Sequence, residues 1–245
     1  MFVLFGCAQH QHDDTLYQVS LIDALLAGEY GGVATVGAVR RQGDFGIGTF
    51  DRLDGEMIVL DGVVYRAKSD GTVERVADTE TTPFAAVTRF EADRRIAIAE
   101  PMSLQALQQR LDTELGNQNI FYAVRIDCAP ARLTIRSVPL QTPPYRPLAE
   151  LIAEQSVWTH EGVAGTLVGL RCPEYSAGLN VPGYHWHFIS DDRHMGGHVL
   201  EAELPACEVD VDRLTNWRVV LPDDAGFGKV DLGADRRKEL ERVEK

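Results

Sequence analysis

The stretch Gly183-Tyr184-His185-Trp186-His187-Phe188-Ile189 alternates histidine with aromatic side chains. Such alternation is typical of a β-strand, in which side chains two residues apart point to the same face. The two histidines are therefore predicted to project together, while Trp186 and its aromatic neighbours fill the opposite face. The polar stretch that follows ends in Gly196-Gly197 and predicts a hairpin loop, and His198 then begins the returning strand.

This hairpin predicts a metal site, because it can bring His198 beside His185 and His187. Three neutral imidazoles suit Zn²⁺ and leave one coordination position open for water or substrate. A closed structural site would need a fourth ligand, usually cysteine, and no cysteine is near in sequence. Nickel, copper, iron and manganese also bind imidazole. A polar surface strand, or core histidines bonded to carbonyl groups, would give the same pattern without a metal.

Elsewhere the chain alternates short β runs with a few helices. The glycine-punctuated stretch 43–67 predicts strands joined by turns at Asp54-Gly55 and Asp61-Gly62. A helix is expected over 20–27 with Ser20 as its N-cap, and a clearer one over 103–115, where leucines recur at helical spacing. Further strands are expected over 120–126, 132–138, 162–170, 183–189, 198–204 and 217–221, and further helices over 148–154 and 234–245.

This pattern indicates an α+β fold. The proline-rich segment 142–147 is the best linker in the chain. We therefore expect an N-terminal mixed-sheet part with short helices over 15–142. A smaller C-terminal β-sheet or barrel-like part is expected over 143–245, with the metal site between the two. Residues 1–14 are expected to be disordered or a residual export segment.

Composition excludes some partners. The formal net charge of −13 argues against nucleic acid and anionic membranes, which require a basic face. No apolar run reaches the ~18 residues that span a membrane. Four scattered cysteines suggest reduced or buried thiols. The apolar start ending in Leu4 to Cys7 is interpreted as a frayed strand in a cytoplasmic protein. The alternative is a truncated export or lipid-anchor signal.

The hairpin sequence, read as GYHxHFI and GGHV around a polar loop, resembles the metal-binding segment of α-acetolactate decarboxylases. Two further blocks resemble the same family in the same order: Gly43 to Glu56 and Asn119 to Asp127. The resemblance implies decarboxylation of 2-acetolactate to acetoin and CO2, on the route to butanediol. It also implies a homodimer. The chain departs from the family in having Trp186 between the ligands, where leucine is common. Because Trp186 is expected to point away from the metal, little effect on chemistry is anticipated.

The resemblance also assigns site residues. It places the metal ligands on His185, His187 and His198, active-site groups on Glu56, Arg136 and Glu244, and pocket walls on Thr49 and Leu53. At the poorly matched tail, Glu241 is the alternative to Glu244. A divalent ion, most simply Zn²⁺, would stabilise the enediolate formed as CO2 leaves. Arg136 would bind the substrate carboxylate, Glu56 would position groups and shuttle a proton, and Glu244 would protonate one face or handle the hydroxyl group.

Two rival functions are compatible with the histidine pattern. One is a non-catalytic β-domain with a structural metal. The other is a cupin-like metalloenzyme, which also carries His-x-His on a strand. Cupin-like sites usually add a Glu or Gln ligand shortly afterwards, whereas here the nearby acids are Asp191 and Asp192 in the predicted loop.

Overall fold

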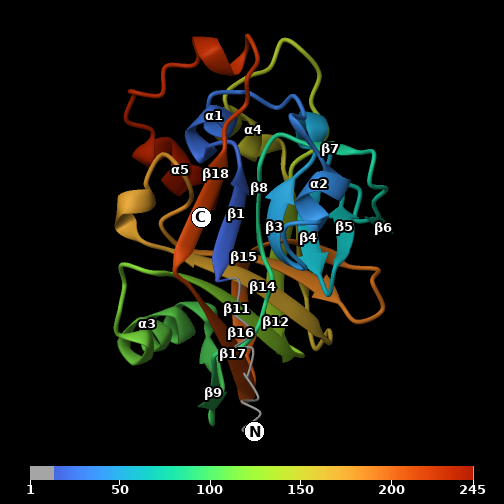
Figure 1. Cartoon of the computed structure of the whole chain (residues 1–245). Coiled ribbons are helices and arrows are strands. Elements are labelled where there is room, and N and C mark those ends of the chain that lie inside the picture. Colours follow the sequence, from blue (N-terminus) through green and yellow to red (C-terminus); the bar gives the residue numbers. More distant parts are fainter. Residues whose placement is uncertain (1–13, 245) are drawn as a thin grey trace, which may run out of the picture.

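The computed structural model describes residues 14–244, and two large β-sheets make up most of it (Figure 1). The segment Leu4 to Cys7, in which an export signal was considered, lies outside the described residues, as does nearly all of the expected disordered segment 1–14. Within 14–244, no helix is both long enough and apolar enough to cross a membrane.

The first sheet has seven strands in the order β18-β1-β8-β3-β4-β5-β6. Its strand β18 comes from the C-terminal part of the chain and runs parallel to β1. The bounds are β1 Thr15–Val19, β3 Phe45–Thr49, β4 Glu56–Leu60, β5 Val63–Ala67, β6 Val73–Arg75, β8 Ala85–Thr88 and β18 Asn216–Val220.

The second sheet follows the order β13-β12-β16-β15-β14-β11-β17-β9, with β10 paired to β16. Its bounds are β9 Arg94–Ile98, β10 Met102–Ser103, β11 Phe121–Cys128, β12 Arg132–Ser137, β13 Ser156–His160, β14 Gly165–Cys172, β15 Gly183–Ser190, β16 Gly196–Leu204 and β17 Cys207–Leu214. A short separate ladder joins β2 Ala34–Thr35 to β7 Thr81–Thr82.

The proline-rich segment had suggested a boundary at residue 142. The boundary between the two sheets does not lie there. Strands β9, β11 and β12 precede that segment but belong to the second sheet, and β18 follows it but belongs to the first. The segment instead connects neighbours within one sheet, since β12 and β13 on either side of it pair antiparallel. Prolines mark an extended connection, but long-range pairing decides which sheet a strand joins.

Within the described part of the chain, five α-helices and four 3-10 turns accompany the sheets. They are α1 Ile22–Leu26, α2 Val36–Arg40, α3 Leu104–Leu115, α4 Leu148–Leu151 and α5 Arg237–Glu244, with η1 Asp51–Leu53, η2 Ile152–Glu154, η3 Glu174–Ser176 and η4 Phe227–Lys229. Helix α3 begins after Ser103, whose Oγ accepts from Ala106 N and caps the helix. The expected cap at Ser20 is wrong: Ser20 has φ 61°, its backbone N–H extends the β1–β18 pairing, and Leu21 precedes α1.

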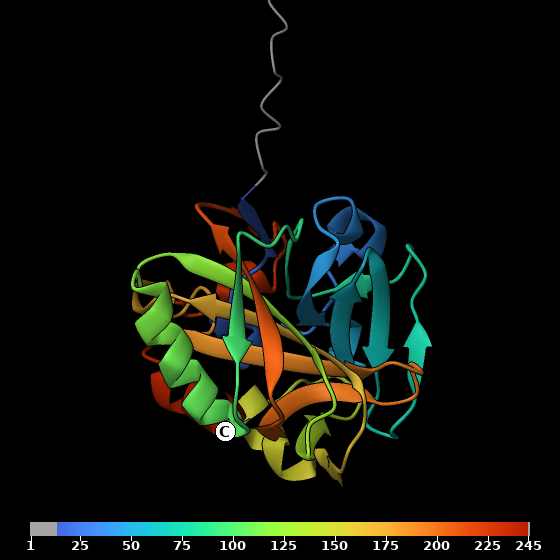
Figure 2. The same cartoon turned by 90° about the horizontal axis from the view of Figure 1, so that it is seen from below.

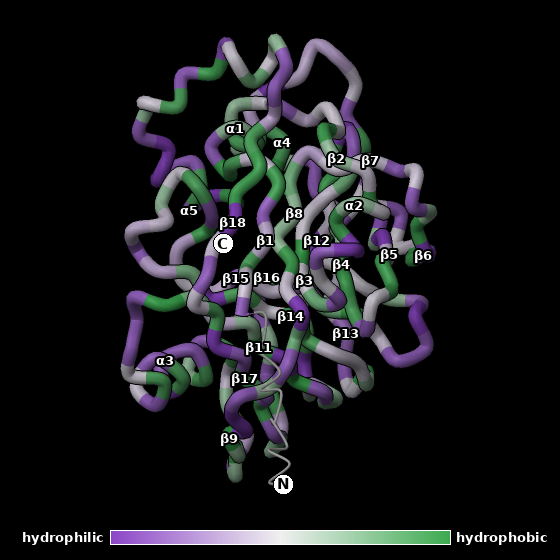
Figure 3. The backbone as a smooth tube through the Cα atoms, in the orientation of Figure 1, coloured by the Kyte–Doolittle hydropathy of each residue, from purple (hydrophilic) through white to green (hydrophobic). Residues whose placement is uncertain are grey.

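The two faces of β15 enter different cores. Phe188 and Trp186 pack with the leucines of α3, which lies along the outer side of the second sheet (Figure 2). Ile189, on the histidine face, packs with Ile47 and Ile58 of the first sheet. Apolar residues concentrate in the strands and polar residues in the outlying loops (Figure 3). The histidine face of β15 is therefore turned toward the first sheet.

Candidate metal centre and active site

The three histidines of the hairpin converge because of strand register. His187 and His198 are direct cross-strand partners, and His185 lies two residues before His187 on the same face of β15. One nitrogen from each ring lies within 4.8 Å of the others, and His185 Nε2 is 3.1 Å from His198 Nδ1. The exposed fractions are only 8%, 1% and 2% for His185, His187 and His198.

Burial keeps these imidazoles neutral. It lowers the pKa of His185 to about 3 and the pKa values of His187 and His198 well below 6.5. His187 Nδ1 donates to the carbonyl of Met57 in β4 at 2.8 Å, which leaves Nε2 with a free lone pair and no hydrogen-bond partner among residues 14–244. A backbone carbonyl that fixes the tautomer of a ligating histidine is a common feature of metal sites. The donor set therefore fits a divalent transition metal.

Arg136 occupies the next cross-strand position, opposite His198 on β12. The β12–β16 register shifts between Thr134 and Ile135, an irregularity that re-aims side chains beside the site. Arg136 as a whole residue is 4% exposed. Its Nη1 donates to Glu56 Oε1 at 3.0 Å, and its Nη2 donates to the carbonyl of Val243 at 2.9 Å. This arginine thus joins the first sheet to the C-terminal helix.

Glu56 begins β4 and reaches the histidines from the first sheet. Its Oε2 lies 3.7 Å from His187 Nε2. Burial raises its pKa to about 7, although the Arg136 guanidinium opposes that shift. The preceding turn is unusual, since Arg52 and Leu53 have φ of 59° and 57°. Non-glycine residues seldom hold this conformation, and such strain clusters at functional sites.

The two pocket residues on this sheet have different contacts. Thr49 is the cross-strand partner of Glu56, and its hydroxyl donates to the carbonyl of Gly55 at 2.9 Å, so it holds the turn that leads into β4. Leu53 is buried at 4% exposure and packs with apolar residues of α1 and α4.

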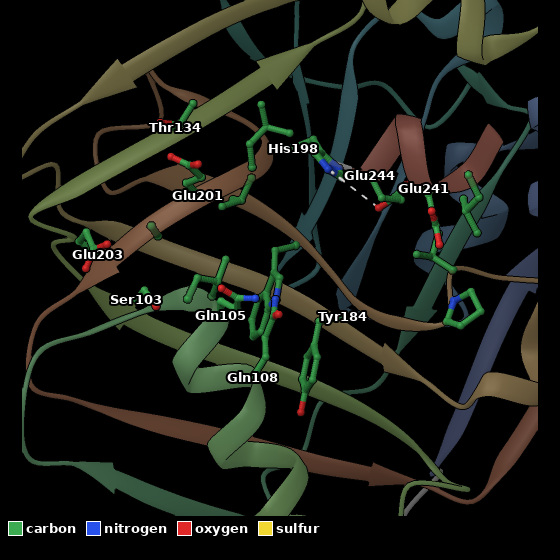
Figure 4. A pocket seen from close by; sticks show the side chains of 18 of the residues that line it. Ser103, Gln105, Gln108, Thr134, Tyr184, His198, Glu201, Glu203, Glu241 and Glu244 are labelled. Atoms are coloured by element: carbon green, nitrogen blue, oxygen red, sulfur yellow. Dashed lines mark ion pairs between the residues drawn. The ribbon is translucent and has the colours of Figure 1, made fainter. Parts of the chain in front are cut away.

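Glu244 reaches the cluster from the last turn of α5. Its Oε2 lies 3.9 Å from both His185 Nε2 and His198 Nε2. Burial raises its pKa to about 7, against the lowering effect of Arg136. Glu241, the alternative in the sequence, is exposed and lines a neighbouring groove (Figure 4) but not the cavity that holds the three histidines. The structure brings Glu244 to the histidines, not Glu241.

These groups surround one cavity of about 50 Å³. Its lining includes all eight residues that the sequence singled out: Thr49, Leu53, Glu56, Arg136, His185, His187, His198 and Glu244. It also includes an apolar wall that was not predicted from the sequence: Ile22, Leu25, Phe84, Val138, Leu148 and Val243. No local pattern marks these six, because each reaches the cavity through tertiary packing.

The features expected of a cupin-like site do not lie here. Asp192 accepts hydrogen bonds from Ser190 Oγ and from the backbone N–H of His194, so it closes the hairpin loop. Both Asp191 and Asp192 are exposed, and neither lines the histidine cavity.

Comparison with known proteins agrees with this site. Residues 16–234 match the family model described as alpha-acetolactate decarboxylase. An alpha-acetolactate decarboxylase of Methanosarcina mazei is 47% identical over 95% of this chain and 81% of its own length. One from Bacillus subtilis is 38% identical over 94% and 90%, respectively. A crystal structure of the enzyme from Bacillus subtilis strain 168 superposes with a TM-score of 0.91, covering 94% of this chain and 99% of that one. The chain therefore belongs to the alpha-acetolactate decarboxylase family.

Proposed function

We propose that the chain catalyses metal-dependent decarboxylation of 2-acetolactate to acetoin and CO2 in this cavity. The observation that carries the proposal is the convergence of three buried, neutral histidines with Glu56, Arg136 and Glu244. Family membership supports the reaction. The donor set supports a divalent metal, for which Zn²⁺ is the simplest choice.

The reaction determines what the site must supply. Loss of CO2 breaks a carbon–carbon bond and leaves its electron pair on the adjacent ketone, so that negative charge develops on the ketone oxygen. A metal bound by three neutral imidazoles would keep its full positive charge to stabilise that oxygen. One proton must then be delivered to the carbon that lost CO2.

Arg136 is suited to bind the substrate carboxylate. It is buried and permanently charged, and its Nε has no partner among residues 14–244. A carboxylate bound there would also compete with Glu56 for Nη1. The same guanidinium can therefore hold the substrate and release Glu56 for another role.

The two glutamates are suited to handle the proton. Because burial raises both pKa values to about 7 in the metal-free fold, each carboxyl group is suited to give or take a proton near neutral pH. We assign Glu56 to positioning and proton shuttling, and Glu244 to protonation of the carbon or to the substrate hydroxyl group. Glu56 lies against His187, whereas Glu244 lies against His185 and His198, so delivery from only one of them would reach a single face and give one acetoin enantiomer.

The test is a colorimetric acetoin assay on purified protein with 2-acetolactate, before chelation, after chelation and after Zn²⁺ is restored. We expect activity to disappear and return, and Arg136→Ala or Glu56→Gln to lower kcat/KM by about a hundredfold or more. Absence of bound metal in active protein would contradict the proposal. Full activity of Glu56→Gln would contradict the role given to that residue. The homodimer is a further prediction, which light scattering can check.

A further inference from the structure

A groove of about 930 Å³ lies beside the histidine cavity (Figure 4). Strands β12, β15 and β16 line it together with the start of α3 and one face of α5. The groove and the cavity share two lining residues, His198 and Glu244. These two side chains therefore form the wall between the groove and the histidine cavity.

The groove exists because β15 and β16 separate at the histidines. Their ladder has only three pairs and ends at His187↔His198. Beyond that point β15 continues along β14, while β16 continues along β12 and meets β10 at its far end. A gap therefore opens between the two strands, beside His185 and His198.

The floor of the groove leads toward the site along β12 and β16. Alternate cross-strand pairs are Arg132↔Glu203 and Thr134↔Glu201, and beyond the register shift Arg136 pairs with His198. The first two pairs line the groove, and the third lines the cavity. Arg237, Glu241 and Glu244 of α5, spaced at about one helical turn, form a wall of the same groove.

We propose that this groove is the route by which the divalent metal ion and the anionic substrate reach the histidine cluster, with Glu244 at its inner end. The inference rests on the proposed function for the identity of the substrate. The path itself is inferred from the structure, because the histidine cluster is buried and the groove reaches His198 and Glu244, two of the residues around it.

The charge of the groove makes the route testable. Its lining contains five glutamates and only two arginines: Glu174, Glu201, Glu203, Glu241 and Glu244, with Arg132 and Arg237. A cleft dominated by one sign of charge concentrates ions of the opposite sign and depletes ions of its own sign. Removal of negative charge from the groove should therefore slow metal entry and speed substrate entry.

The test compares Glu201→Gln/Glu203→Gln with Glu161→Gln/Glu208→Gln. Both double variants remove two exposed carboxylates, but the control pair does not line the groove. At low ionic strength we expect the groove variant to take up Zn²⁺ into metal-free protein about fivefold more slowly. We expect its kcat/KM for 2-acetolactate to rise about two- to fourfold. Both differences should vanish at about 0.5 M salt, whereas the control should match the unsubstituted protein.

A steric variant gives a second test that does not depend on charge sign. Glu201→Trp should obstruct the groove and slow both Zn²⁺ uptake and kcat/KM about tenfold, whereas Glu208→Trp, at an exposed position on β17, should not. Uptake and kcat/KM indistinguishable from the controls in both tests would overturn the proposed route. If the unsubstituted protein makes no acetoin, the proposed function fails, while the metal-uptake measurements still decide the route.

Discussion

The histidine hairpin and the C-terminal helix meet at the same site, but they are held there in different ways. His185 and His187 lie on β15, which pairs along its whole length with β14, and His198 lies on β16, which pairs with β12. Glu244 ends an eight-residue helix whose buried side chains are Leu240 and Val243. The rings are fixed by strand hydrogen bonds, and the carboxylate by a small apolar contact and by the hydrogen bond from Arg136 to the Val243 carbonyl.

This contrast separates two parts of the chemistry. Displacement of α5 would remove Glu244 and the Val243 carbonyl that accepts from Arg136, but it would leave the imidazoles in place. Local openings cost least where few apolar contacts are lost. We therefore expect metal binding to depend on the hairpin, and proton transfer to depend on the helix.

The largest effect is expected when a histidine of the hairpin is removed. His187→Ala removes one of three ligands and should lower bound zinc to a trace and kcat/KM by at least about a thousandfold. Metal analysis and the acetoin assay on the same sample measure both. His194→Ala, an exposed loop histidine, is the matched control and should retain both metal and activity. A fully active, metal-loaded His187→Ala would contradict the ligand assignment.

The helix side should respond differently. Glu244→Gln should lower kcat about a hundredfold, because a proton donor is lost, while zinc stays bound. Glu241→Gln, one turn earlier on the same helix, should change kcat little, because Glu241 does not line the cavity. If Glu244→Gln lost its zinc as well, metal binding would depend on the helix too, and the assignment of metal binding to the hairpin alone would be wrong.

The raised pKa of Glu244 also predicts a pH effect on stability. Burial raises the pKa of this carboxyl group from 4.5 to about 7 in the metal-free fold. Its favourable contribution is therefore complete below pH 4.5 and is lost as the pH rises through about 7. Between pH 5.5 and 8.5, metal-free wild type should lose about 2 kcal/mol relative to Glu244→Gln. Urea unfolding at the two pH values measures this, and an equal difference at both would contradict the shift.

Short-range patterns were enough to predict much of this site. The alternation around His185 and His187 predicted a strand, and Gly196-Gly197 predicted the hairpin that returns with His198. Both predictions hold because hairpin register is set within about twenty residues of chain. The placement of Glu244 came instead from resemblance to a family, since a charged terminal helix gives no local sign that one of its carboxylates is buried.

The pairing of strands that lie far apart in the sequence could not be predicted from local patterns. The pairing of β18 with β1 joins segments that lie far apart in the sequence, and nothing near either strand predicts it. Strand β17 was missed although Val209 and Val211 alternate with charged residues there, a signal that could have found it. The apolar cavity wall is likewise assembled from separate elements, so no spacing rule identifies it.

A smaller effect should follow from loosening the helix without altering its chemistry. Leu240→Ala removes apolar contact between α5 and its core and should lower kcat about fivefold, with zinc retained. Leu107→Ala in α3 is the control. It leaves a cavity in the other core and should cost about 2–5 kcal/mol of stability, with kcat unchanged at temperatures where it stays folded. Equal loss of kcat in both variants would mean that general destabilisation, not the position of α5, controls activity.

The smallest effect on activity is expected behind the hairpin. The Trp186 ring lies on the face of β15 away from the ligands and covers Gly169 of β14, where an added Cβ would collide with it. Trp186→Leu should therefore cost about 1–3 kcal/mol of stability but change kcat/KM less than about twofold. Gly169→Ala should destabilise the wild type more than it destabilises Trp186→Leu, because the smaller side chain leaves room for the methyl group. A large fall in zinc affinity in Trp186→Leu would show that this face of β15 also positions the histidines, and the ladder alone would not account for their arrangement.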